Sequence, residues 1–150
     1  MITTEQIKKL RGETGLSIAQ CRFALEEAGG DEAKAIDILN KNASGIALKK
    51  GERQLGAGTV AAYIHTGDMV GVLLELLCET DFVSKNPEFK SVAREIAMHV
   101  AAMNPANNEE LLGQSFIKDP SKTVGDLVNG TVQKFGERTE IGRFTRFSVK

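Results

Sequence analysis

The chain has 150 residues, of which 41% are hydrophobic and 26% are charged, and its formal net charge is −1. This composition is typical of a soluble globular chain with one domain, or one domain and a small appendage, and the balanced charge disfavours direct binding to nucleic acid. No apolar run approaches the roughly 20 residues of a membrane span and the N-terminus lacks a signal-peptide pattern, so we expect a cytoplasmic protein without a membrane partner.

The first 45 residues are predicted to form three short helices. Two pairs have the capping-box spacing that begins a helix, Thr3 with Gln6 and Ser17 with Gln20. Helix-ending glycines and a third cap follow at Gly15, Gly29-Gly30 and Asp31. A bundle of this size has a small and marginally stable core, which favours a recognition module (1–45) over a catalytic domain.

A second domain is predicted over residues 57–150, after a linker at 46–56 that mixes glycine with charge. Residues 59–65 and 69–79 are strand-like and are joined by a tight turn. This pattern indicates a β-hairpin.

The two faces of the second strand differ. Alternate residues are expected to face the core: Val70, Val72, Leu74, Leu76 and Cys78. The opposite face carries Leu73 and Leu77 beside Glu75 and Glu79, so it is half apolar. Such a face needs at least partial cover, from the chain itself or from a second copy.

Asn86 and Pro87 are predicted to begin a strong amphipathic helix, as its cap and first residue, and Asn104-Pro105 to end it. The buried stripe expected on this helix comprises Phe89, Val92, Ala93, Ile96, Ala97, Val100 and Met103. Thr123 can cap another helix, and residues 139–149 are predicted to form a final strand. The second domain is therefore α+β, with helices covering an antiparallel sheet of about three strands.

The sequence contains no recognisable catalytic motif. Phosphate-binding glycine loops, the G-x-S-x-G nucleophile elbow and the H-E-x-x-H zinc motif are absent. The close carboxylate pairs, Glu26-Glu27 and Glu109-Glu110, are typical of solvated helix faces. The basic clusters at 49–53 and 138–150 indicate a linker and an edge strand protected by charge. We therefore expect no catalytic residue and no cofactor.

Neither the cysteines nor the histidines form a predicted site. Cys21 and Cys78 lie far apart and in no C-x-x-C pair, which disfavours a disulfide framework and a cysteine zinc site. Both are expected to be small buried hydrophobic residues. His65 and His99 have no cysteine at ligand spacing, so no metal site is expected.

One loop raises a question of function. The segment C-E-T-D-F-V-S-K-N-P-E-F, residues 78–89, places an aromatic residue between a buried strand and a capped helix. Thr80 and Asp81 are ordinary turn residues, and Phe82 could fold back to seal the end of the core. Alternatively, the Phe82 ring could project as an anchor for a pocket on another protein. The residues alone leave both possibilities open.

The motif T-D-F-V at 80–83, within L-L-C-E-T-D-F-V-S-K-N, resembles the signature of the bacterial translation elongation factor Ts family, the guanine-nucleotide exchange factors for elongation factor Tu. Residues 10–36 resemble the N-terminal, three-helix ubiquitin-associated-like module of that family. The segments I-A-M-H-V-A-A (96–102) and P-S-K-T-V-G-D-L (120–127) resemble its core segments. Several long matches in the right order are far more specific than one short motif.

The resemblance implies which residues bind the partner. Asp81 and Phe82 match the pair that inserts near the magnesium site of the partner GTPase and disturbs magnesium and phosphate coordination, so that nucleotide leaves. Thr80 and Val83 match the residues that shape this loop. His99 matches a residue that presses near the phosphate-binding loop. The N-terminal module would pack on the nucleotide-binding domain through Arg11, Leu16, Ser17, Ile18 and Ala19.

The chain also departs from the family pattern. Long members carry two related core halves and a coiled-coil hairpin, with the T-D-F-V loop in one half and the histidine helix in the other. This chain has room for one half, and because the final strand is directly followed by Lys150, we expect the C-terminal module of the family to be missing. Two chains are therefore expected to pair, as in short members, so that one contributes Phe82 and the other His99. The candidate dimer contact is the face with Leu73 and Leu77.

The resulting prediction is a non-enzymatic guanine-nucleotide exchange factor that binds elongation factor Tu, both with GDP and free of nucleotide, and forms a homodimer. The alternative is an adaptor that docks peptides or other proteins through a helical module and a dimerisation domain, without promoting exchange.

Overall fold

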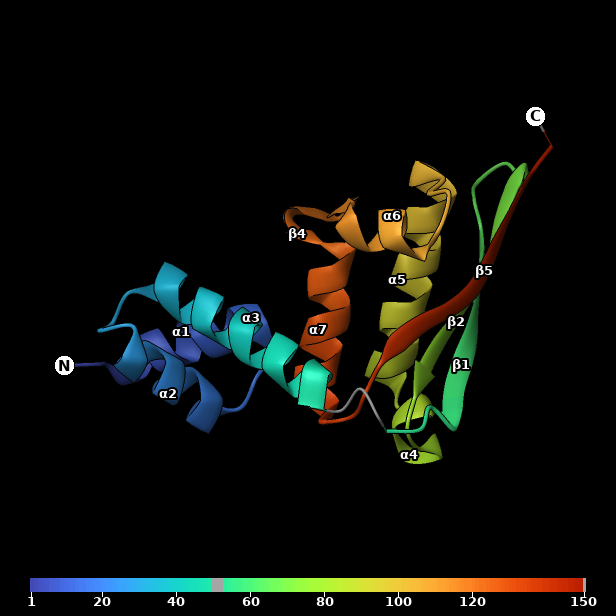
Figure 1. The fold of residues 1–150 in the computed structure, drawn as a ribbon. Helices are drawn as coiled ribbons and strands as arrows, with labels where there is room; N and C mark the ends of the chain where they lie inside the picture. Colours follow the sequence, from blue (N-terminus) through green and yellow to red (C-terminus); the bar gives the residue numbers. More distant parts are fainter. Residues whose placement is uncertain (50–52, 150) are drawn as a thin grey trace.

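The computed structural model describes residues 1–49 and 53–149, with only the backbone of 43–49. In chain order it contains α1 (Thr4–Thr14), α2 (Ile18–Glu27), α3 (Glu32–Lys49), β1 (Ala57–Ile64), β2 (Val70–Cys78), α4 (Asp81–Ser84), α5 (Pro87–Met103), α6 (Asn108–Gly113), β3 (Ser115–Phe116), β4 (Asp119–Thr123), α7 (Val124–Phe135) and β5 (Glu140–Ser148). The fold is α+β, as predicted: a bundle of three helices lies at one end and a sheet with its covering helices at the other (Figure 1).

The N-terminal bundle is built by local signals that the sequence displays. The side chains of Thr3 and Ser17 each accept a hydrogen bond from a backbone N–H three residues on, and the glutamines at those positions complete both predicted capping boxes. Gly15 ends α1 in the left-handed conformation, with φ of 70°. The bundle buries a core of its own, which contains Leu10, Leu16, Cys21, Ala24, Leu25, Ala35 and Leu39.

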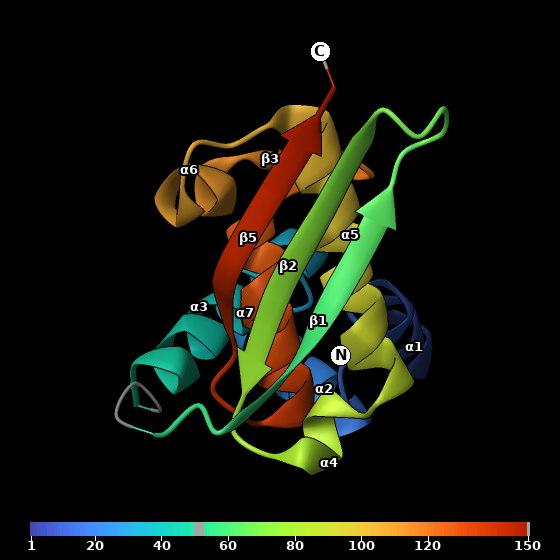
Figure 2. The same cartoon turned by 90° about the vertical axis from the view of Figure 1, so that its right-hand side faces the viewer.

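The sheet has the strand order β1-β2-β5, and both pairings are antiparallel. The predicted hairpin is confirmed, because β1 pairs with β2 from Ala57↔Cys78 to Ile64↔Gly71. The predicted final strand is β5, which pairs with the other edge of β2. Figure 2 looks onto the sheet, with β2 between the two edge strands.

The main core lies between the sheet and α5. Helix α5 packs on β1 and β2, and α7 lies beside α5 on the same side of the sheet (Figure 1). Phe89 at the start of α5 is fully buried, and its ring meets that of Phe135 edge to face with centroids 6.1 Å apart. The strand residues predicted to face the core line it, with Val70 only partly buried.

The last turn of α5 differs from the prediction. Met103 is 47% exposed, whereas Ala101 is buried. Arg146 of β5 donates a hydrogen bond from Nε to the Ala101 carbonyl oxygen at 3.1 Å, which keeps that side of the helix against the strand. Residues two apart point about 200° from each other around a helix, so Met103 faces solvent. The prediction that Met103 is buried was therefore wrong.

Several short elements were not predicted from the sequence. These are the single turn α4, the helix α6 and the small hairpin of β3 and β4, which occupies what looks like a polar stretch in the sequence. Asn108 attaches α6 to β5 by donating its side-chain N–H groups to the carbonyl oxygens of Ile141 (3.2 Å) and Gly142 (3.0 Å). Long-range contacts of this kind leave no periodic trace in the sequence.

The third helix of the bundle is longer than the predicted N-terminal module. Helix α3 continues to Lys49, beyond the predicted limit of the N-terminal module at residue 45, and it packs against α7. Residues 50–52 of the predicted linker lie outside the described residues. The buried clusters of the bundle and of the sheet domain are separate, which supports two units, and their limits stay a prediction.

Two phenylalanines seven positions apart provide a matched test of this packing. Phe89→Ala should lower the free energy of unfolding by about 3–5 kcal/mol, because it leaves a cavity under α5. Phe82→Ala should change it by no more than about 0.5 kcal/mol, because that ring is 87% exposed. Urea unfolding of both variants measures the difference. Equal losses in the two variants would contradict the packing described here.

Candidate functional site

The candidate site is the connection between β2 and α5, which is more ordered than a simple loop. Thr80 caps the single turn α4, with its side chain accepting from the Val83 N–H at 3.5 Å. Asn86 then caps α5, accepting from the Glu88 N–H at 2.9 Å, and Pro87 occupies the first turn. The predicted start of α5 is confirmed. Two caps six residues apart fix the path of the chain on both sides of Phe82.

The aromatic ring of this connection points away from the protein. Phe82 is 87% exposed, whereas Val83, the next residue, is 4% exposed and belongs to the main core. Adjacent residues of a helical turn point about 100° apart, so anchoring Val83 in the core directs Phe82 outward. Asp81 is exposed beside it. The possibility that Phe82 seals its own core is wrong.

A glutamate distant in sequence holds the start of this connection. Glu137 Oε1 accepts hydrogen bonds from the backbone N–H groups of Glu79 (3.1 Å) and Thr80 (3.0 Å), and its Oε2 accepts from the Thr80 hydroxyl at 2.7 Å. In return, Glu79 Oε2 accepts from the Arg138 backbone N–H at 2.6 Å. We call these reciprocal contacts between residues 79–80 and 137–138 the clasp. Analysis of the sequence did not identify Glu137.

The thiol of Cys78 adds a contact on the other side of Thr80. Its Sγ donates to the Thr80 carbonyl oxygen at 3.3 Å, and the Ser84 N–H reaches the same oxygen at 3.2 Å. Burial raises the pKa of the Cys78 thiol, and the nearby Glu137 carboxylate raises it further, so the thiol keeps the proton that it donates. The N–H, hydroxyl and carbonyl groups of Thr80 are therefore all bonded. As predicted, both cysteines are buried and free.

His99 lies inside the protein rather than on a surface. Its side chain is fully buried, with Nδ1 accepting from the Ile117 N–H at 3.2 Å and Nε2 lying 2.9 Å from Gln114 Oε1. Because a backbone N–H can only donate, Nδ1 must be unprotonated and the Nε2–H donates to the glutamine. The ring also stacks on Phe116, with centroids 5.9 Å apart. His99 therefore anchors the hairpin of β3 and β4.

Within one chain, the two predicted exchange residues lie far apart. Phe82 precedes the first turn of α5 and His99 lies in its last two turns, so about 18 Å of helix separates Pro87 from His99. Figure 1 shows α4 at one end of α5 and α6 at the other. Contact between His99 and a partner stays a prediction, and it requires the hairpin of β3 and β4 to move.

The predicted contact residues of the N-terminal module are mostly accessible. Arg11, Ser17, Ile18 and Ala19 are exposed around the start of α2, whereas Leu16 is buried in the bundle core. Leu16 can therefore support this surface but cannot contribute much of it. Phe23, one turn further along α2, is also exposed and was not predicted.

The outer face of the sheet is apolar and open in the described chain. It carries the exposed side chains of Val60, Ile64, Leu73 and Phe147, of which Leu73 is 50% and Phe147 72% exposed, while Leu77 is half-buried. Figure 2 shows the three strands with no described helix in front of them. A groove of about 420 Å³ runs along this face between Ile64, Leu73 and Phe147.

One ion pair crosses the same face. Arg143 Nε donates to Glu75 Oε1 at 2.7 Å, and the Arg143 backbone N–H donates to Glu75 Oε2 at 3.2 Å. These hydrogen bonds lower the pKa of Glu75, so its carboxylate stays ionised. Glu75, near the middle of the outer face of β2, is thus already paired within the chain.

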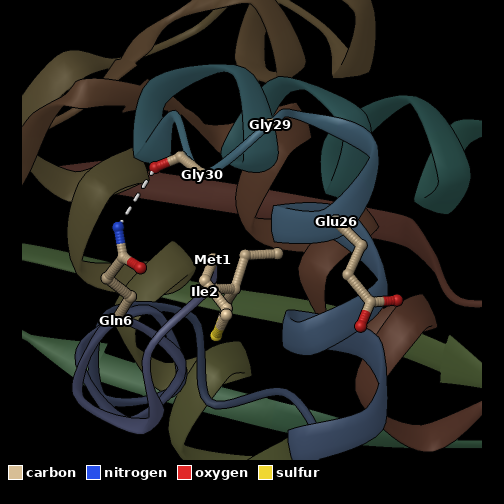
Figure 3. A pocket seen from close by; sticks show the side chains of 6 residues that line it. All are labelled: Met1, Ile2, Gln6, Glu26, Gly29 and Gly30. Carbon is tan, nitrogen blue, oxygen red and sulfur yellow. Dashed lines mark hydrogen bonds between the residues drawn. The ribbon is translucent and has the colours of Figure 1, made fainter.

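A second hollow lies in the N-terminal bundle, away from all the predicted site residues. Its volume is about 380 Å³, and Figure 3 shows it between the first residues of the chain and the turn after α2. Gln6 bridges its rim by donating from Nε2 to the Gly30 carbonyl oxygen at 3.3 Å. Its one carboxylate, Glu26, is paired with Arg22. This arrangement does not resemble a catalytic or cofactor site.

Over the parts of the chain that the structure describes, no three histidine, cysteine, aspartate or glutamate side chains gather as metal ligands would. In the same parts, none of the helices has the length and apolar character required to cross a membrane.

Comparison with known proteins shows that the sequence is similar to the members of one protein family. The chain matches the family model described as Elongation factor TS over residues 32–109 and 79–150. A protein named Elongation factor Ts from Thermodesulfovibrio yellowstonii is 37% identical over 192 residues, which cover 99% of this chain and 96% of the relative. A protein of the same name from Carboxydothermus hydrogenoformans is 40% identical over 194 residues, with 99% and 89% covered.

A third relative is about twice as long as the part of it that aligns with this chain. The Elongation factor Ts of Trichlorobacter lovleyi is 44% identical over 148 residues, which cover 99% of this chain but 48% of the relative. The alignments with the first two relatives are longer than the 150 residues of this chain, so those proteins contain internal residues that have no counterpart here.

The buried histidine provides a test of the site as described. His99→Phe keeps a ring against Phe116 but leaves the Ile117 N–H and the Gln114 amide without their partner, which should lower the free energy of unfolding by about 1–3 kcal/mol. His65→Phe is the matched control: that histidine is exposed, and its change should stay within about 0.5 kcal/mol. Urea unfolding measures both. An unchanged stability of the His99 variant would show that the two hydrogen bonds are not formed.

Proposed function

Because the chain belongs to the elongation factor Ts family, we propose that it is a guanine-nucleotide exchange factor that releases GDP from elongation factor Tu during translation elongation. The observation that supports this proposal is the direction of Phe82. A phenyl ring that is 87% exposed, on a single turn fixed by two caps, is a pre-ordered apolar anchor for a partner. Asp81 presents a carboxylate beside it, which can compete near a bound magnesium ion.

The proposed mechanism is coupled binding and requires no covalent step. A factor that weakens the affinity of the GTPase for nucleotide must itself be bound less tightly when nucleotide is present, by the same ratio. A weakening of about 10⁴-fold requires about 5.5 kcal/mol of differential contact. This role needs neither a nucleophile nor a cofactor from this chain.

The magnitude of this coupling requires more than one contact. Burial of one phenyl ring contributes about 1.5–3 kcal/mol, so Phe82 alone cannot supply the differential free energy. The exposed start of α2, around Ser17 and Ile18, is the second surface in this proposal, and His99 the third. A protein of this kind would act in the cytoplasm and would bind neither nucleic acid nor membrane directly.

We further propose that two copies pair through the outer face of the sheet. The four exposed apolar side chains on this face lie around Glu75, whose charge is satisfied by Arg143, so a second copy can cover the middle of the face without burying that charge unpaired. Leu73 and Leu77 lie on the central strand of this face. Pairing would also bring His99 of one copy into the same assembly as Phe82 of the other.

The alternative is an adaptor that binds a partner without promoting exchange. The exposed surface of α2 would suit it as well, because a ubiquitin-associated-like bundle can dock another protein without any exchange loop. An exposed Phe82 could anchor an adaptor to its partner as well, so we favour exchange because the chain belongs to the elongation factor Ts family.

Release of fluorescent GDP from elongation factor Tu tests the proposal. The wild-type chain should accelerate release, and Phe82→Ala should reduce this acceleration by about 10–100-fold, the range that corresponds to loss of one buried phenyl ring. Met103→Ala is the control, since it also removes an exposed apolar side chain but lies at the far end of α5. Wild-type protein that binds elongation factor Tu without accelerating release would identify an adaptor instead.

Pairing through the sheet is tested by a charge on its central strand. Leu73→Asp should convert a dimer into a monomer in light scattering at micromolar concentration, because the introduced carboxylate would be buried without a partner. Leu112→Asp, on the exposed side of α6, should leave the mass unchanged. A wild-type protein that is monomeric and fully active in exchange would contradict the dimer.

A further inference from the structure

The clasp joins two places that are far apart in the sequence. Glu79 and Thr80 end the central strand β2, whereas Glu137 and Arg138 follow the end of α7. Gly136 ends α7 in the left-handed conformation, with φ of 69°, and this reversal brings Glu137 back to the end of β2 instead of along the helix axis. A residue with a Cβ takes up this conformation only at a cost, so the glycine contributes to the placement of the carboxylate.

The Glu137 carboxylate is matched to the groups around it. Three donors converge on its two oxygens: two consecutive backbone N–H groups and one hydroxyl, at 2.7–3.1 Å. An ionised carboxylate only accepts hydrogen bonds, and such charge-assisted bonds are stronger than neutral ones. A glutamine at this position would turn one N–H group toward these donors.

Thr80 connects the hydrogen bonds of Glu137 to the turn that carries the exposed Phe82 ring. It is the cap of α4, and its carbonyl oxygen accepts from the Ser84 N–H, so its orientation sets that of the turn. Phe82 lies two residues beyond Thr80 within this turn. Since Phe82 itself contacts little of the protein, its direction depends on the backbone that carries it.

The geometry points to Glu137 as a positioning residue for nucleotide exchange: its carboxylate fixes the backbone of Glu79 and Thr80 and thereby the direction in which Phe82 meets the partner. This inference rests on the proposed exchange function. Glu137 does not have to touch the partner, because it acts through Thr80. Pre-ordering the turn lowers the conformational entropy that is lost when Phe82 enters a pocket.

A purely structural role makes a different prediction. If Glu137 only stabilised the fold, Glu137→Gln would lower the free energy of unfolding but leave the exchange rate of the folded protein unchanged. If it positions Phe82, the maximal rate of GDP release at saturating concentration of the factor should fall by about 5–30-fold, the effect expected from losing one or two charge-assisted hydrogen bonds. The rate and the stability are therefore measured on the same variants.

The experiment compares four single variants and one double variant of the full chain in release of fluorescent GDP from elongation factor Tu. Glu137→Gln removes the charge at nearly constant size, Glu137→Asp keeps the charge but shortens its reach, and Thr80→Val removes the hydroxyl partner. Glu109→Gln, at an exposed glutamate of α6, is the matched control and should exchange like wild type. Glu137→Gln and Thr80→Val should each lower the maximal rate, and the double variant should lose less than the product of the two effects because both remove the bond between the Thr80 hydroxyl and the Glu137 carboxylate.

Amide hydrogen exchange tests the clasp independently of the GDP-release assay. In Glu137→Gln the Thr80 N–H should exchange at least tenfold faster than in wild type, while amides in the middle of α5 keep their protection. If wild type fails to release GDP, the proposed function fails, and hydrogen exchange still tests the clasp. A Glu137→Gln protein that is folded and releases GDP within twofold of wild type would overturn the inference, as would fully multiplicative effects in the double variant. If Glu137→Gln does not fold, Glu137→Asp decides by the same twofold limit, because Thr80→Val also removes the cap of α4.

Discussion

The burial of α5 along the sheet is the constraint on which the rest of the molecule depends. Phe89 begins the helix inside the core and Val100 is still buried near its end, so the helix has little freedom of position. The end of β2 is fixed equally well by the burial of Cys78. The connection between them must join these two buried ends in eight residues, which restricts its path. Thr80, Asn86 and the carboxylate of Glu137 accept hydrogen bonds from backbone N–H groups along this path, and the Phe82 side chain points outward.

The sequence predicted those parts of the fold that depend on near neighbours. Both capping boxes, the hairpin, the start of α5 and the cap of α7 follow from residues within a few positions of one another, and all are present. The short helix α6 and the hairpin of β3 and β4 were missed, because their order depends on Asn108 reaching β5 and on His99 reaching Ile117. Neither contact can be recognised from spacing.

The same division applies to the candidate site. The motif around Phe82 identified the loop, and the alternation of β2 with the strong cap at Asn86 located it between two buried elements. The residues of the loop did not determine whether the ring faces inward or outward, because that depends on the burial of Val83 in a core made by other elements. Glu137 could not be identified either, since its three donors lie 57 or 58 residues away in the chain. Spacing also gave no indication that the ring nitrogens of His99 are both bonded inside the protein.

The separation of the two hydrophobic clusters has a consequence for the dynamics of the chain. Local opening is easiest where least apolar surface is buried, so the helical bundle, with its small residues Cys21, Ala24 and Ala35, should open more often than the sheet domain. Helix α3 belongs to the bundle yet packs on α7, and α7 leads directly into Glu137. If a bound protein ordered the bundle, α7 would therefore be the first element of the sheet domain to lose mobility. The two ends of the molecule are linked by one continuous path of helix and turn, along which a change in order at one end can alter mobility at the other.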